Sequence, residues 1–237
     1  MLLAAELCIV VLAAVVQGVS GFGFAVVAVP LVAYLHGLDH AVALGGMLGL
    51  CASLNTVRTS RADIRWPIVG AILRGSMLGI PVGLLALHLV DTRRLTVTTG
   101  IAVLVVTAAL AFGIQVRCTH PMAQSATGVV SGALGACTGM TGPPVVVGLQ
   151  GAEIDASTMR ATIAFTLGVS GAVILVMRAL MGHVHLDVLP VVALGVPMVW
   201  LGNTAGQWIF GRVSGRTYSL VVTTLLGLSG VVALLPR

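Results

Sequence analysis

The sequence carries very little charge. Only 8% of its 237 residues are charged, whereas 58% are hydrophobic. The mean hydropathy of +1.11 is higher than a water-soluble domain of this length could sustain by burying apolar side chains in a core. These values exclude a soluble globular domain and indicate an integral membrane protein.

The chain has no lysine, so its net charge of +5 depends on arginine alone. Most arginines fall in short gaps between apolar runs, a pattern that suits membrane orientation better than nucleic-acid binding. The four cysteines (Cys8, Cys51, Cys118 and Cys137) lack CxxC spacing, so we expect neither a disulfide framework nor a zinc site, and no cofactor. Because no basic segment precedes the first apolar run, we interpret the N-terminus as mature protein rather than signal peptide.

Six uncharged or nearly uncharged runs are long enough to cross a bilayer, whose core of about 30 Å takes about twenty helical residues. They cover approximately residues 41–57, 66–87, 95–116, 161–177, 188–211 and 217–236. Two further apolar stretches, 1–35 and 122–151, are too long for one crossing and tight for two. Each has a glycine-rich interruption near its middle. We therefore predict an all-α integral membrane protein.

The interruptions recur half a chain apart. A shift of 114 residues places Gly18 on Gly132 and Gly21 on Gly135. We predict two homologous halves, 1–117 and 118–237, each a broken glycine-rich element followed by three transmembrane helices, within one transmembrane domain. The distribution of arginines favours hairpins that enter and leave on one side, which would make the halves inverted repeats with both termini outside.

An interrupted helix at membrane depth needs protein or a polar cavity to satisfy its backbone. After GVSGFG and GACTGMTGPP we expect the helices to resume near Phe24 and Pro143. Each restart should present free N–H groups and the positive end of a helix dipole, and two such ends would bind a small anion at the midplane. Hydroxyls of Ser20 and of Thr138 or Thr141 would add donors.

The candidate substrate-binding residues belong to these interruptions, with one arginine from a predicted span. They are Gln17, Gly18, Ser20, Gly21, Phe22, Gly23, Arg74, Cys137, Thr138, Gly139, Thr141, Gly142 and Pro143. Close helix packing is the alternative explanation for the glycines. An arginine inside a span suggests function, but snorkelling to the interface or pairing with Asp63 would explain Arg74 equally well.

The two interruptions together resemble a known family. QGVSGFGFAVVAVPLV, followed half a chain later by SGALGACTGMTGPPVVV, is similar to the paired signature of the TauE/SafE sulfite exporter family, also called TSUP. The resemblance covers essentially the whole chain. It implies a multi-pass secondary transporter of the bacterial inner membrane, not an enzyme, that moves sulfite, a sulfonate or a related organosulfur anion.

Other interpretations stay open from the residues alone. A passive anion channel would use the same helix ends. Gly18 to Gly21 match the GxSG pattern of rhomboid intramembrane proteases, but no histidine after Ser20 lies in the middle of a span to serve as its base. Apart from Glu6, no acidic residue lies deep in an apolar run, so the residues do not decide whether transport is coupled to a proton or another ion. They also leave open the identity of the anion, the direction of transport and whether the protein forms a homo-oligomer.

Overall fold

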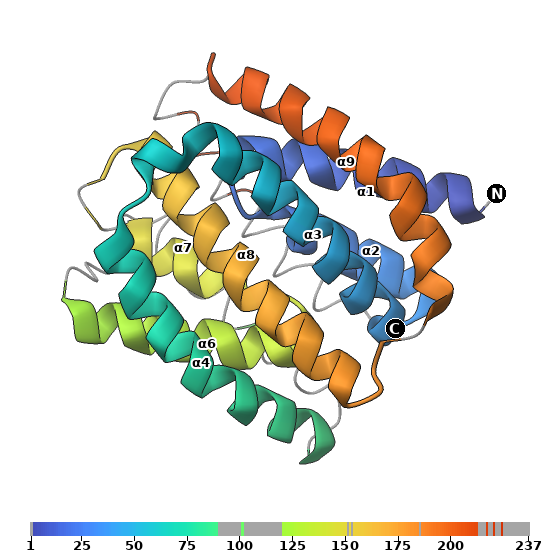
Figure 1. Cartoon of the computed structure of the whole chain (residues 1–237), viewed down its shortest axis with the longest axis horizontal. Coiled ribbons are helices and arrows are strands. Elements are labelled where there is room, and N and C mark those ends of the chain that lie inside the picture. Colours follow the sequence, from blue (N-terminus) through green and yellow to red (C-terminus); the bar gives the residue numbers. More distant parts are fainter. Residues whose placement is uncertain are drawn as a thin grey trace.

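The computed structural model describes residues 2–89, 101, 120–150, 152, 154–184, 186–212, 217, 220 and 224 (Figure 1). Its elements are α1 (Leu2–Ser20), α2 (Gly23–His36), α3 (Leu38–Ser60), the 3-10 helix η1 (Arg61–Asp63), α4 (Trp66–Leu89), α6 (Pro121–Thr138), α7 (Gly142–Gln150), α8 (Ala156–Leu180), the 3-10 helix η2 (Leu186–Val188) and α9 (Leu189–Phe210). These described elements confirm the all-helical prediction.

Five helical stretches in the described part are long and apolar enough to cross a membrane. They are Leu2–Ser20, Leu38–Asp63, Trp66–Leu87, Ala156–Leu180 and Leu189–Phe210. Four of them contain or largely cover predicted spans, and the first lies in the long N-terminal run, where α2 adds a shorter apolar helix. The predicted span 95–116 lies outside the described residues except for Ile101, as does 217–236 except for residues 217, 220 and 224.

Each glycine-rich interruption is a sharp turn between two helices that fold back on one another. Glu6, near the start of α1, contacts His36 at the end of α2. The turns use Gly21 and Gly139, with φ of 85° and 77°, in the left-handed region that only glycine enters without cost. The second helices begin at Gly23 and Gly142, one residue before the predicted restarts.

The hairpins are held by long helix pairs on either side of a central pair. In Figure 1, α1 runs along α9, α6 runs along α4, and α3 lies beside α8. The outer pairs are close enough to require glycine. A Cβ on Gly206 would lie 2.2 Å from the carbonyl oxygen of Val15, and one on Gly79 would lie 2.1 Å from that of Val129. Packing therefore explains these two glycines.

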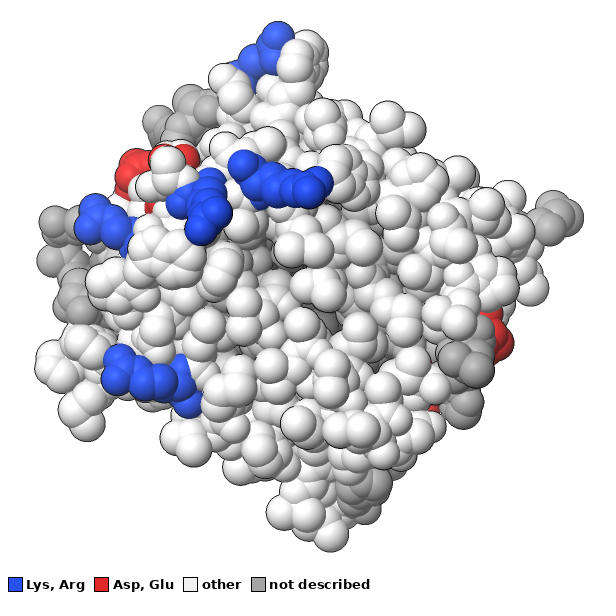
Figure 2. Space-filling model, in the orientation of Figure 1, with Lys and Arg blue, Asp and Glu red and all other residues white. Residues whose placement is uncertain are grey.

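The two ends of α3 differ in charge. Four exposed arginines lie near the C-terminal end of α3: Arg58, Arg61, Arg65 and Arg212. Figure 2 shows arginine side chains gathered toward the left and top of the face it presents. Asp39 lies at the other end of α3, about 33 Å away by the rise of a helix. It shares that end of the molecule with Glu6 and Asp187, both bound to His40.

Candidate anion-binding site

The two turns meet in the middle of the molecule. A Cβ on Gly142 would lie 2.9 Å from Cδ2 of Phe22, so the second turn packs directly on the first. A Cβ on Gly139 would lie 3.0 Å from Val42 of α3 and 3.4 Å from Val29 of α2. Segments about half a chain apart in the sequence thus form one central region.

A small cavity lies where the turns meet. Its volume is about 60 Å³, on a scale where one water molecule needs about 10–15 Å³. Much of the wall is apolar or glycine, from α2, α3 and α8. Four polar residues interrupt it: Gln17, Ser53, Thr141 and Arg178. A few polar groups on an apolar wall is the usual composition of a small-molecule site.

Arg178 is the positive charge in this wall. Its side chain is only 1% exposed. Nη1 donates to the carbonyl oxygen of Ala136 at 2.9 Å, and Nη2 donates to the carboxylate of Asp39 at 2.5 Å. Nε has no hydrogen-bond partner among the described residues. Because leaving a buried donor unsatisfied costs about 1–3 kcal/mol, this N–H is suited to an acceptor that enters the cavity.

Sequence reasoning missed Arg178. The predicted span ended at Met177, so the arginine stood at its edge, in a place where a surface charge is ordinary. Its partner Asp39 lies 139 residues earlier. No local sequence pattern predicts an ion pair between residues so far apart in the chain. Only the packing of α8 beside α3 brings Arg178 and Asp39 together.

At the first turn three backbone N–H groups are bonded to side chains of α1, and the prediction that they are free is wrong. Oγ of Ser20 accepts the N–H groups of Phe22 at 3.3 Å and Gly23 at 3.0 Å. Oε1 of Gln17 accepts the N–H of Phe24 at 3.0 Å. The last turn of α1 therefore caps the start of α2 with its own side chains. The Ser20 hydroxyl also donates to Val16, which fits a structural cap and not a protease nucleophile.

The second turn is built differently. Pro143 and Pro144 occupy the first turn of α7 and carry no N–H, so the donors left at this end are those of Thr141 and Gly142. Thr141 also lines the cavity. Thr138 is not among the residues that line the cavity; its hydroxyl donates to the carbonyl oxygen of Leu134 at 2.8 Å and accepts the N–H of Met140 at 3.4 Å.

Twelve of the thirteen predicted site residues, all except Arg74, fall into three groups. Four line the cavity: Gln17, Phe22, Gly139 and Thr141. Most others form or support the turns: Ser20, Gly21, Gly23, Thr138, Gly142 and Pro143. Gly18 and Cys137 make helix contacts, since a Cβ on Gly18 would lie 2.3 Å from the carbonyl oxygen of Asn203 and Sγ of Cys137 donates to that of Gly83.

Arg74 lies apart from both turns. Its side chain is exposed on α4, and Nε donates to the carbonyl oxygen of Gly70, one turn earlier in the same helix, at 3.1 Å. It is not among the residues that line the cavity. This position favours the interfacial interpretation of Arg74 over a contact with a centrally bound anion.

A second buried arginine supports the first hairpin. Nε of Arg160 donates to the carbonyl oxygen of Gly18 at 2.9 Å, and its guanidinium lies 4.6 Å from the ring centre of Phe210. Gly18 and Ala136 are each two residues before the end of their helix, α1 and α6. Arginines at the two ends of α8 thus satisfy carbonyls at the negative ends of both interrupted helices. Sequence reasoning missed this role as well.

Comparison with known families decides the membership of the chain. Residues 7–233 match the family described as "Sulfite exporter TauE/SafE". The chain belongs to the TauE/SafE family. The resemblance of the two glycine-rich motifs is thereby confirmed, and the protein is a multi-pass membrane transporter of sulfite or organosulfur anions, not an enzyme. Neither the curated proteins nor the solved structures gave a match.

Proposed function

We propose that this TauE/SafE protein is a secondary transporter that holds sulfite, or another small sulfur oxyanion, in the cavity between the two turns. The observation that carries the proposal is Arg178, a buried guanidinium on the cavity wall with one N–H left without a partner among the described residues. An oxyanion offers several acceptor oxygens to a guanidinium, and such charge-assisted hydrogen bonds are stronger than neutral ones.

The other polar groups would complete the site. The Ser53 hydroxyl accepts from Nε2 of Gln17 at 3.3 Å, and a hydroxyl that accepts one bond still has its own proton to donate. Thr141 adds a second hydroxyl at the start of α7. The positive end of the α7 dipole supports anion binding from the same side.

We also propose that residues 1–117 and 118–237 are inverted repeats whose hairpins re-enter the membrane. The helix pairs support this relation, because each is made of one element from either half in exchanged positions: α1 with α9, α6 with α4, and α3 with α8. The end bearing Arg58, Arg61 and Arg65 would face the cytoplasm of the bacterial cell. A reporter active only in the cytoplasm should then fail when it is fused after Arg237; full activity would remove the inverted arrangement.

The test of the binding site is uptake of labelled sulfite into proteoliposomes. We expect Arg178→Gln to abolish uptake, whereas Arg74→Gln, which removes an exposed arginine, should retain it. Since Arg178→Gln leaves Asp39 without its guanidinium partner, the double variant Arg178→Gln/Asp39→Asn removes both charges and so avoids an unpaired carboxylate that could cause misfolding. Wild-type uptake by a folded double variant would contradict the proposal. Acceleration of labelled efflux by sulfite outside would distinguish a carrier from a channel.

A further inference from the structure

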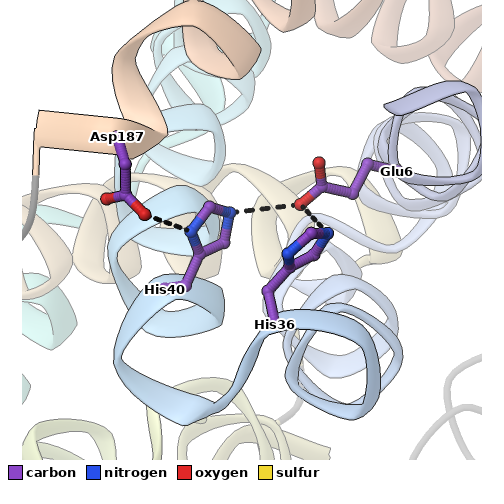
Figure 3. A network of polar contacts seen from close by, with 4 residues as sticks. All are labelled: Glu6, His36, His40 and Asp187. Atoms are coloured by element: carbon purple, nitrogen blue, oxygen red, sulfur yellow. Dashed lines mark hydrogen bonds and ion pairs between the residues drawn. The ribbon is translucent and has the colours of Figure 1, made fainter. Parts of the chain in front are cut away.

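A cluster of four titratable side chains lies at the end of the molecule opposite the exposed arginines. Oε1 of Glu6 contacts Nε2 of His40 at 3.1 Å and Nε2 of His36 at 3.5 Å, and Nδ1 of His40 contacts Asp187 at 3.5 Å (Figure 3). The imidazole rings of His36 and His40 stack with centres 4.9 Å apart. The cluster ties together the start of α1, the end of α2, the start of α3 and η2.

The cluster has no fixed positive charge of its own. Glu6 is 3% exposed, and the ion pairs of the described residues join it only to imidazoles. A buried carboxylate is costly unless a positive group faces it or it takes up a proton. The two stacked rings repel one another if both are charged. The charge of the cluster therefore changes with the number of protons that its two imidazoles and two carboxylates hold.

The charged groups packed around the cluster connect it to the cavity. His40 follows Asp39 in the first turn of α3. Asp39 binds Arg178 of the cavity wall, and its other oxygen lies 3.8 Å from Nδ1 of His183. The helix α9, which packs along α1, contributes no charged residue. A proton on His40 would add positive charge one residue along the chain from Asp39, which would favour an anion at Arg178.

We propose that Glu6, His36, His40 and Asp187 form a proton-binding site, and that a proton held there moves together with the anion. The inference rests on the proposed transport of a sulfur oxyanion. Loss of the proton at one face of the membrane would weaken anion binding and release both, whereas the loaded form could exchange one anion for another without releasing the proton.

Two measurements on the same proteoliposomes test the inference. The first is exchange of labelled for unlabelled sulfite at equal pH, and the second is accumulation of sulfite driven by a pH gradient with the membrane potential clamped. Glu6→Gln resembles the protonated carboxyl, so we expect it to keep exchange and lose gradient-driven accumulation. His40→Gln should likewise lose accumulation. Glu6→Asp retains a titratable carboxyl and should recover part of it.

The controls are His120→Gln and Asp63→Asn, exposed residues outside the cluster, which should behave as wild type. All variants experience the same gradient and the same protonation of sulfite itself, so a difference between them reports on the protein. The inference is overturned if Glu6→Gln accumulates sulfite like wild type, if exchange and accumulation fall in equal proportion, or if the wild type exchanges sulfite without responding to the gradient. A wild type without exchange would instead refute the proposed function.

Discussion

The two interrupted helices of this protein share an outline and differ in how their second helices begin. In the first, Ser20 and Gln17 cap the start of α2 from the preceding turn. In the second, Pro143 and Pro144 open α7 and leave Thr141 at the cavity. A glycine-rich turn therefore does not define a binding site by itself. What matters is whether neighbouring side chains have already used its donors.

This comparison indicates different roles for the two turns. The first turn supplies a closely packed wall, because Gly21 packs against Arg160 and Phe22 against Gly142. In the proposed site the second turn would supply donors, together with Arg178 on the same cavity wall. We expect substitutions in the first turn to affect mainly folding and those in the second to affect mainly anion binding.

The largest effect is expected at Gly21, whose φ is 85° and whose added Cβ would lie 2.8 Å from the carbonyl oxygen of Arg160. The backbone conformation alone costs a residue other than glycine about 1–3 kcal/mol. Gly21→Ala should therefore lower the midpoint of thermal unfolding in detergent and reduce the yield of folded protein.

Gly70→Ala is the matched control, because a Cβ there would meet nothing within 4 Å and α4 is an ordinary helix. Alanine should stabilise that helix by up to about 1 kcal/mol. Equal unfolding midpoints for the two variants would show that the first turn is not closely packed.

An intermediate effect is expected at Thr141. Thr141→Val keeps the shape of the side chain but removes the hydroxyl, and a hydrogen bond to a charged group contributes about 1.5–3 kcal/mol. The affinity for sulfite should fall by about tenfold or more, as measured by equilibrium binding to purified protein. Thr138→Val, in the same turn but bonded within α6, should leave the affinity unchanged. Equal losses at the two threonines would remove the distinction between them.

The smallest effect is expected at Ser20. Ser20→Ala removes the acceptor of two N–H groups and should cost about 1 kcal/mol of stability, the usual value of a helix cap. Sulfite affinity should stay at the wild-type value, because the hydroxyl serves the turn and not the cavity. A large fall in affinity without loss of stability would instead place the anion at the first turn and reverse the comparison.

Several features could be predicted from the sequence because their causes are local. Apolar runs long enough to cross a bilayer predicted four of the crossing-length helices, and the glycine clusters predicted both interruptions to within one residue of their restarts. The positive φ of Gly21 and Gly139 follows the same logic, since a sharp reversal needs a residue without a Cβ.

The arginine of the proposed site could not be predicted in this way. Arg74 lies inside an apolar run and was therefore predicted to bind the anion, yet its side chain is exposed. Arg178 lies at the end of an apolar run and was not predicted, yet its side chain is buried against Asp39 and Ala136. A buried charge is defined by the groups that surround it, and those groups come from helices far apart in the chain.

The sequence by itself determined that this protein lies in a membrane, that its chain is helical and where two helices break, because hydropathy, helix length and glycine content act over neighbouring residues. The tertiary structure decided which break is capped, which arginine faces the cavity and which histidines meet Glu6. Those outcomes depend on side chains that approach one another only after the hairpins pack between the helix pairs, and no spacing along the chain encodes that approach.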